Sequence, residues 1–439
     1  MRIRNVQHEN MKHEQGSRPR VSSCFMSSCF IFLALAMMLI TGCAASKDQQ
    51  QAERAIMDFH AGDLAAATRE LQPLAKKTNE NFVLNNVRLG SVTLAAYNLD
   101  DAENAFLAAY EVINSTGVNN GGRTLGAVLV DEKIKVWKGE PYERAMANFY
   151  LGLIYYMRQD YNNARAAFEN ALFKLRDYAD EKAKDFKEVE SNFAPAQLML
   201  AKSFQRLGRD DLANANFEKV SPALRALANP ELNARSNLLL VIDYGYAPRK
   251  ITDFDGAMVG FAPTPMEAGP IPRPSVQIDG AFYPFGDLNA PTVDLLALAQ
   301  DRRWQSIDTI RTLKSAVGTG LLIGSAIEGM RGLNGSGARQ RTDLMVAGGL
   351  LAGGLLLKAT SQADTRQWEL LPRSIFVLPM HVAPGQHELT VSFPGSDLHQ
   401  TLRNLIVPES GETTYYLRMQ RWNHEPPPGL VQASTDQSN

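Results

Sequence analysis

The sequence predicts an α+β protein with three parts: an N-terminal α-helical repeat array, a glycine-rich helical hairpin and a small C-terminal β-sandwich-like module. Three observations support this prediction. Residues 51–228 are rich in Ala and Leu at helical spacing and poor in Pro. Residues 316–360 contain apolar segments rich in glycine. Within 361–422, four runs with the pattern of β-strands follow, separated by turn residues.

Residues 1–42 predict a lipoprotein signal peptide. Basic residues precede a segment, Val21–Ser46, that has no charged side chain, which is the order of regions in an export signal. The tetrapeptide Ile40-Thr41-Gly42-Cys43 resembles the lipobox of bacterial lipoproteins. There the cysteine is lipidated and becomes the mature N-terminus. The alternative is an ordinary signal peptide, or an uncleaved anchor, with an accidental cysteine.

The lipobox resemblance implies that Cys43 carries the lipid, acyl chains such as palmitate, and that residues 43–50 form a lipidated tether. Ala44 at the next position, rather than Asp, implies an outer-membrane location on the periplasmic face. Cys24 and Cys29 leave with the signal, so the mature chain has no cysteine pair for a disulfide. A formal net charge of −2 argues against a nucleic-acid partner, which requires a basic surface.

The helical region repeats one pattern of small and large side chains. Ala164 lies 13 positions after Leu151, and Phe168 lies four positions further along. The units that share this spacing are Leu89–Ala102–Phe106, Leu151–Ala164–Phe168 and Leu200–Ala213–Phe217. The pattern resembles the tetratricopeptide repeat, in which small residues let paired helices approach closely and large residues fill the gap.

The repeat spacing is irregular. Ala67 and Ala102 are 35 positions apart, but the following steps, to Ala164 and then Ala213, are 62 and 49 positions. Insertions are therefore expected after the second and third units. The first insertion, residues 114–141, has a Gly/Asn cluster before β-branched residues and predicts a loop with a short strand or hairpin.

The repeat resemblance implies that the inward positions of the first helices line a concave protein-binding surface. These positions are Phe149, Leu153, Tyr156, Leu198, Lys202, Gln205 and Arg206. The alternative is that the aromatic residues among them belong to the core, which is the more frequent outcome at helical spacing.

Residues 229–315 predict a mixed connector of strand, loop and helix. The apolar run Leu238–Ile242 precedes a turn and predicts a buried strand. Residues 251–292 contain many Pro and Gly, which fits either strand-and-turn structure or a long surface loop. A helix is expected from Thr292 through residue 316.

The hairpin predicted at 316–360 has glycine faces suited to close helix contact, in the manner of a glycine zipper. The glycines spaced by four residues are Gly320 and Gly324, and Gly349 and Gly353. The second apolar run, Leu344–Leu357, is shorter than the roughly 20 residues of a membrane-spanning helix. The hairpin is expected either to be buried in the protein or between protomers, or to dip into the membrane.

Four strands are expected in the C-terminal module, at 374–382, 387–393, 400–407 and 413–419. Together they resemble the small β-sandwich modules appended to many envelope lipoproteins. Asp364, Arg366 and Trp368 are expected to form a structural corner before the module. The Pro-rich tail, 423–439, is expected to be disordered.

The sequence contains no recognisable constellation for catalysis. The chain after Cys43 has five histidines but no His-x-x-x-His or cysteine pair, so no metal site is expected. Gly-x-Ser-x-Gly and phosphate-binding Gly-Lys-Ser/Thr motifs are absent. Asp243, Asp253 and Asp255 are expected to be turn or capping residues rather than a paired acid and base.

Three stretches, GEPYERAMANFYLGLIYYMRQDYNNARAAF, DYGYAPRK and ADTRQWELLP, resemble the landmarks of an uncharacterised family of tetratricopeptide-repeat-containing bacterial outer-membrane lipoproteins. The resemblance covers most of the mature chain and implies no catalytic residue. With the lipid tether, it favours a non-enzymatic periplasmic scaffold that binds partner proteins in cell-envelope assembly, without a cofactor, and that can form a homo-oligomer. The alternatives are a membrane-inserting or oligomeric pore-associated lipoprotein, through the hairpin, and a carboxylate-based cell-wall hydrolase.

Overall fold

The structure is a computed structural model that describes residues 46–114, 136–178, 188–190, 193–253, 258–264, 269–300 and 364–419. The signal peptide with Cys43, the hairpin with its four glycines (Gly320, Gly324, Gly349 and Gly353) and the tail at 423–439 lie outside the described residues, as does most of the helix expected from Thr292. The chain divides into two units, Met1–Gln50 and Gln51–Asn439. Only 46–50 of the first unit is described, and the account below concerns the second.

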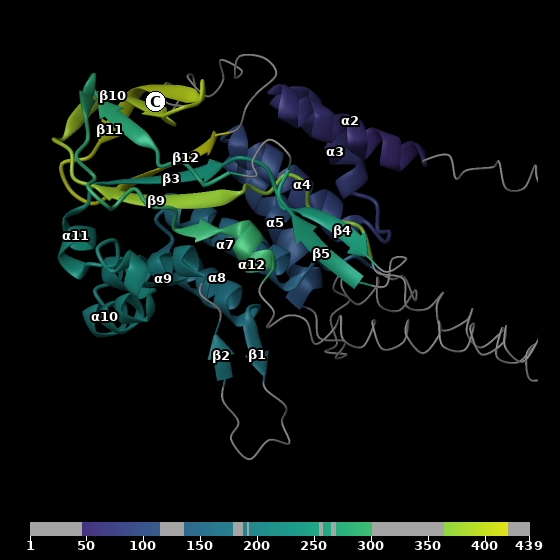
Figure 1. Cartoon of the computed structure of the whole chain (residues 1–439), viewed down its shortest axis with the longest axis horizontal. Coiled ribbons are helices and arrows are strands. Elements are labelled where there is room, and N and C mark those ends of the chain that lie inside the picture. The colour runs from purple at the N-terminus through teal and green to yellow at the C-terminus, as the bar shows by residue number, and fades with distance from the viewer. Residues whose placement is uncertain are drawn as a thin grey trace, which may run out of the picture. The chain divides into compact units, whose positions relative to one another are not determined.

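The described residues combine helices and sheets in one α+β unit (Figure 1). The helices in this part of the chain are α2 (Lys47–Ala61), α3 (Leu64–Ala75), α4 (Phe82–Ala95), α5 (Leu99–Asn114), α7 (Pro141–Met157), α8 (Tyr161–Phe173), α9 (Ala194–Arg206), α10 (Asp210–Lys219), α11 (Pro230–Arg235) and α12 (Leu295–Ala299). From α3 to α10, each helix packs on the next along the chain. None of the helices in this part combines the length and apolar character that crossing a membrane requires.

Capping residues set where these helices begin. The Asp63 carboxylate accepts a hydrogen bond from the Ala66 amide at 2.8 Å at the start of α3, and Asp160 accepts one from Asn163 at the start of α8. At α7, the Glu143 carboxylate accepts a hydrogen bond from the Glu140 amide at 2.7 Å, in a capping box. Each contact satisfies an amide that has no partner within its helix.

Two glycines allow close contact inside the helix pairs. A Cβ built on Gly90 would lie 2.8 Å from the Phe106 ring, and one on Gly152 would lie 2.8 Å from the Phe168 ring. Such a distance is shorter than real Cβ contacts, so each ring packs directly on the backbone of the facing helix. The regular spacing of small and large residues in the sequence therefore corresponds to real helix–helix contacts in these two pairs.

The central sheet has the strand order β12-β3-β9-β8. Its strands are β3 (Leu238–Tyr244), β8 (Val293–Asp294), β9 (Ser374–Met380) and β12 (Thr413–Met419). β3 runs parallel to β12, with Leu238 opposite Thr413, and antiparallel to β9. A second sheet has the order β11-β10-β6-β7, from β6 (Ser275–Ile278), β7 (Ala281–Phe282), β10 (Gly385–Ser392) and β11 (His399–Val407).

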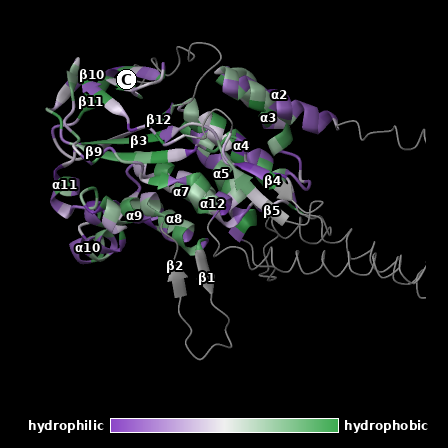
Figure 2. Cartoon of the chain, in the orientation of Figure 1, coloured by the Kyte–Doolittle hydropathy of each residue, from purple (hydrophilic) through white to green (hydrophobic). Residues whose placement is uncertain are grey.

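The central sheet is buried on both faces. Leu239 and Val241 of β3 belong to the core shared with the helices, whereas Leu238, Leu240 and Ile242 belong to the core shared with the second sheet. This division follows from the alternation of side chains along a strand. Because neither face meets water, β3 and β9 are almost entirely hydrophobic (Figure 2).

Two short hairpins complete the described strands. β1 (Arg176–Tyr178) pairs with β2 (Glu188–Glu190) in the second expected insertion and projects from the helices in Figure 1. β4 (Arg249–Asp253) pairs with β5 (Met258–Ala262). With β6 and β7, the second hairpin shows that the Pro- and Gly-rich region forms strands and turns rather than one long loop.

The four strands expected in the C-terminal module are present, but the sheets do not end at the expected boundary. β3 and β8 share the central sheet with β9 and β12, and β6 pairs with β10. The connector expected at 229–315 is therefore not separate from the module expected at 361–422. Pairing between strands so distant along the chain leaves no local sequence signal.

Residues 364–373 form the expected corner between the helices and β9. Trp368 is buried and forms two hydrogen bonds to the helices. Its amide donates to the Glu143 carboxylate at 2.7 Å, and its indole N–H donates to the Ser91 hydroxyl at 3.0 Å. Arg88 of α4 forms a bidentate ion pair with Glu369: its Nη2 lies 2.6 Å from Oε1 and its Nε lies 2.9 Å from Oε2. These contacts tie α4 and α7 to the strand that follows.

Candidate binding groove

The concave surface expected from the repeats is covered by the central sheet. Phe149, Leu153 and Leu198 are fully buried, Tyr156 and Lys202 are buried, and Gln205 and Arg206 are partly exposed. The expectation that these seven residues line an open protein-binding surface is therefore not met in this structure. The physical reason is that the helices present a wide apolar face, and the β-strands of the same chain bury it.

A carboxylate of the chain itself occupies the polar part of that surface. Glu412, just before β12, accepts hydrogen bonds from Tyr156 at 2.7 Å and Ser236 at 2.5 Å, and pairs with Lys202 at 2.8 Å. Arg206 lies 3.2 Å from the same carboxylate. Burial raises the pKa of Glu412, but the two cations and the hydrogen bonds outweigh burial and hold the pKa below its usual value.

A second polar contact joins the helices to β3. Asp243, expected to be a turn residue, is instead buried within the strand and accepts hydrogen bonds from the Tyr150 hydroxyl and, at 2.8 Å, the Tyr416 hydroxyl. Burial raises its pKa to about 6, although Arg418 and the two hydroxyls act in the opposite direction. Asp243 lines neither of the two pockets described below.

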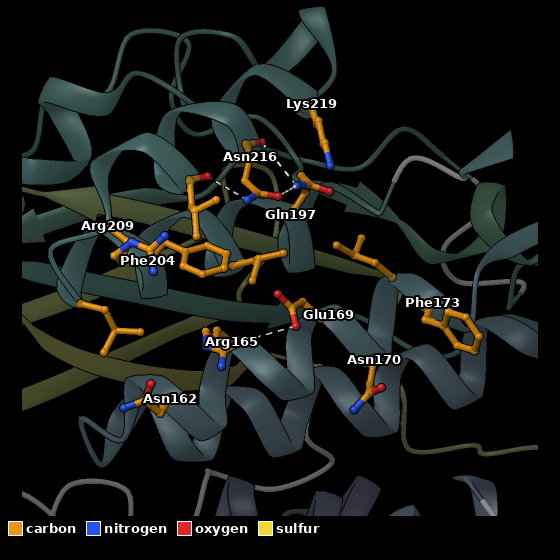
Figure 3. A pocket seen from close by; sticks show the side chains of 14 residues that line it. Asn162, Arg165, Glu169, Asn170, Phe173, Gln197, Phe204, Arg209, Asn216 and Lys219 are labelled. Carbon is orange, nitrogen blue, oxygen red and sulfur yellow. Dashed lines mark hydrogen bonds and ion pairs between the residues drawn. The ribbon is translucent and has the colours of Figure 1, made fainter. Parts of the chain in front are cut away.

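An open groove lies on the other side of α9. Leu198 and Lys202 face the sheet, whereas Leu200 and Phe204 line the groove, as expected for opposite faces of one helix. α8 and α10 form its walls, and its volume is about 850 Å³ (Figure 3). Its apolar lining residues are Leu172, Phe173, Leu200, Phe204, Leu207 and Leu212.

Amide side chains form the polar part of the groove. Gln197 of α9 donates to the Asn216 side-chain oxygen at 2.7 Å, and Asn216 donates to the Leu212 carbonyl at 2.8 Å. Both amides are buried, and Figure 3 shows them facing one another across α9 and α10. Asn162 and Asn170 line the groove from α8. An amide both donates and accepts hydrogen bonds, so it can meet a peptide backbone.

Three cations and one carboxylate line the groove. Arg165 pairs with Glu169 at 3.5 Å, one helical turn away, and its guanidinium lies 5.9 Å from the centre of the Phe204 ring. Arg209 contacts the exposed Asp211 at 3.5 Å. Lys219, at the end of α10, forms no ion pair with any described residue.

Polar side chains join α8 and the end of α7 to α5, but none joins α8 to α10 among the described residues. At the preceding step of the helix stack, Asn170 of α8 donates to the Tyr110 hydroxyl of α5 at 2.9 Å, and Arg158 pairs with Glu103 of α5 at 3.4 Å. Within the described part of the chain, no hydrogen bond or ion pair joins α8 to α10. The groove between these two helices is therefore available to another molecule.

A smaller pocket of about 330 Å³ lies beside β12. It is lined by Tyr97, Ile406 and Thr414 among others, with Glu412 as its carboxylate. The Tyr97 hydroxyl accepts from the Tyr416 amide at 3.1 Å and donates to the carbonyl of the same residue. This hydroxyl covers part of the free edge of the sheet, which leaves less backbone for a strand partner.

Neither pocket is lined by two carboxylates, which is the arrangement that a glycosidase requires. No group of three or more His, Cys, Asp or Glu side chains that could hold a metal ion occurs in the described ranges. The α8–α10 groove lies outside the binding surface predicted from the sequence, because that prediction concerned only the inward positions of the first helices. A signal was present in α8, where Arg165, Glu169 and the exposed Phe173 are spaced by four residues.

Comparison with known proteins adds no assignment: no protein-family model and no curated protein sequence matches this chain.

Proposed function

We propose that this protein is a lipid-anchored periplasmic scaffold that binds a partner protein in the groove between α8, α9 and α10. The open groove is the observation that carries the proposal. It offers apolar side chains, amides and cations together, a combination suited to a protein segment. The concave side of the same helices is already occupied by the central sheet.

In this proposal the helices α3 to α10 form a tetratricopeptide-like array. Two observations support this: Gly90 contacts Phe106 and Gly152 contacts Phe168, and each of these helices packs on the next along the chain. Arrays of this kind are binding platforms whose long surfaces take peptides or proteins. Here the binding surface would be the α8–α10 groove rather than the usual concave one.

The proposal also retains the lipid anchor at Cys43 and the outer-membrane location. Both rest on the sequence alone: the uncharged run before the cysteine and the Ile-Thr-Gly-Cys tetrapeptide. A lipid at the N-terminus would keep the groove near the membrane surface, where partners in envelope assembly are found. The two alternatives, a pore-associated protein and a cell-wall hydrolase, gain no support from the described geometry.

The test is site-specific photo-crosslinking in cells. A photoreactive residue is placed at the exposed groove positions Asn162, Phe173 and Lys219, and at the exposed control positions Met57 and Phe282. We expect one and the same protein to be captured from the groove positions and not from the controls.

A groove-blocking variant completes the experiment. Phe173→Arg puts a long charged side chain in place of an exposed apolar residue of the groove. It is expected to abolish the capture from Asn162 and Lys219 while leaving the melting temperature close to that of the parent, because the position is exposed. Capture that is equal from groove and control positions, or unchanged in Phe173→Arg, would contradict the proposed function.

A further inference from the structure

We propose that the α8–α10 groove selects an acidic partner: a segment in extended conformation in which Asp or Glu alternates with apolar residues. This inference rests on the proposed function and adds the chemistry of the partner. It is carried by the apolar floor of the groove and by the excess of cations along its rim.

The rim of the groove is cationic. Arg165, Arg209 and Lys219 line it, and the one carboxylate that lines it, Glu169, is paired with Arg165. The partner of Arg209, Asp211, is highly exposed at the start of α10, so water screens this pair. Lys219 has no ion-pair partner among the described residues. An incoming carboxylate would therefore find two cations that are weakly engaged or free.

A further cation, Lys174, lies beside the Phe173 end of the groove. The Lys174 ammonium is 5.7 Å from the centre of the Phe173 ring. Burial lowers the pKa of Lys174, and the positive charges of Arg144 and Lys138 lower it further. A partner's carboxylate beside Lys174 would oppose both effects and favour the charged ammonium.

The two carboxylates whose charges act on Arg144, Glu140 and Glu143, also have other partners. Glu140 pairs with Lys250 at 2.8 Å, and Glu143 accepts hydrogen bonds from the amides of Glu140 and Trp368. The Arg144 Nε is buried and has no hydrogen-bond partner within the described structure. A buried guanidinium nitrogen without an acceptor is costly.

The dimensions of the groove set the length of the segment. Its α8 wall extends from Asn162 to Phe173, which is twelve residues, so the eleven steps between them span about 16 Å at ~1.5 Å per residue. An extended chain advances ~3.3 Å per residue, so about five residues of the partner would lie in the groove. Alternation would direct its apolar side chains to Leu200 and Phe204 and its acidic side chains to the rim.

Binding of synthetic peptides tests the inference. The full chain, purified in detergent, is titrated into a fluorescein-labelled six-residue peptide in which Glu alternates with Leu or Phe, and into a second peptide with Lys in place of each Glu. Fluorescence anisotropy should show binding of the Glu peptide only, weakening as salt is raised. Equal binding of the two peptides, or of neither, would overturn the inference.

Charge reversal on the protein provides the second readout. Lys219→Glu and Lys174→Glu are each expected to weaken binding of the Glu peptide by about tenfold. Lys76→Glu is the matched control, because Lys76 is an exposed lysine at the C-terminal end of α3, far along the helix stack from the groove. An unchanged affinity in both groove variants would refute the inference.

The two proposals can fail separately. If photo-crosslinking from the groove captures one protein but the crosslinked segment has no acidic residue, the scaffold function stands and the acidic specificity is wrong. If the Glu peptide binds but no protein is captured in cells, the specificity stands and the scaffold function is wrong.

Discussion

Removing the Glu412 carboxylate tests whether the sheet is locked onto the helices by a buried charge. In Glu412→Gln the Lys202 ammonium keeps its burial but loses the negative charge 2.8 Å away; the side chains of both residues are fully inaccessible to solvent. Breaking a buried ion pair in this way costs about 3–5 kcal/mol. The cost of deprotonating a lysine of pKa ~10.4 at pH 7, about 4.6 kcal/mol, lies in the same range.

Urea unfolding at pH 7 and pH 9 measures this cost. The pKa of Lys202 is already lowered by burial, in opposition to the attraction of Glu412, and loss of that carboxylate lowers it further. The unfolded chain then binds more protons than the folded variant, so the stability of the variant rises with pH. The difference between wild type and variant should shrink by up to about 2.7 kcal/mol between pH 7 and pH 9.

Two controls accompany Glu412→Gln. Glu388→Gln removes an exposed carboxylate that pairs with Arg403 at 3.5 Å, and should cost less than about 1 kcal/mol. The double variant Lys202→Met with Glu412→Leu replaces both charges and should recover much of the lost stability. A cost below about 1 kcal/mol for Glu412→Gln, with no change between the two pH values, would refute the reasoning.

Four further predictions follow from the sequence and the structure. Gly152→Val places a side chain against the fully buried Phe168 ring and should lower the free energy of unfolding by about 1–3 kcal/mol. The same substitution at Gly269, where a side chain would meet open space, should have a much smaller effect. Equal effects of the two substitutions in urea unfolding would show that the contact between Gly152 and Phe168 is unimportant. Asp243 has a pKa of about 6 in the folded protein, above its usual value of 3.8, so its contribution to stability is present below pH 4 and is lost as the pH rises through 6. Asp243→Asn should remove about 3 kcal/mol of this pH dependence, measured by urea unfolding at several pH values. Identical pH profiles of the wild type and the variant would argue against a raised pKa at Asp243. Labelled palmitate should enter the wild type and not Cys43→Ser, and equal labelling would exclude lipidation at that cysteine. Gly349→Leu should change the stability or oligomeric state if the hairpin packs helix against helix, and a variant that matches the wild type in both would count against that packing.

Local patterns predicted most of the individual elements. The helices with regular Ala, Gly and Phe spacing and the four C-terminal strands occur where the sequence placed them, because the period of side chains is a property of a short segment. The corner around Trp368 was also predicted. The α8–α10 groove was not, since it depends on which faces of α8, α9 and α10 remain uncovered after packing.

The sequence by itself predicted the type of many elements: residues 238–242 as a buried strand, residues 374–382 as a strand, and small and large residues at a regular spacing, such as Ala164 and Phe168, as contacts between paired helices. Only the tertiary structure decided what covers their apolar faces. β3 pairs with β12 and β9 from the far end of the chain, and Glu412 inserts between Lys202 and Arg206, where a partner protein was expected. The reason is physical: an apolar face specifies that it must be buried but not what buries it, because the hydrophobic effect has no direction.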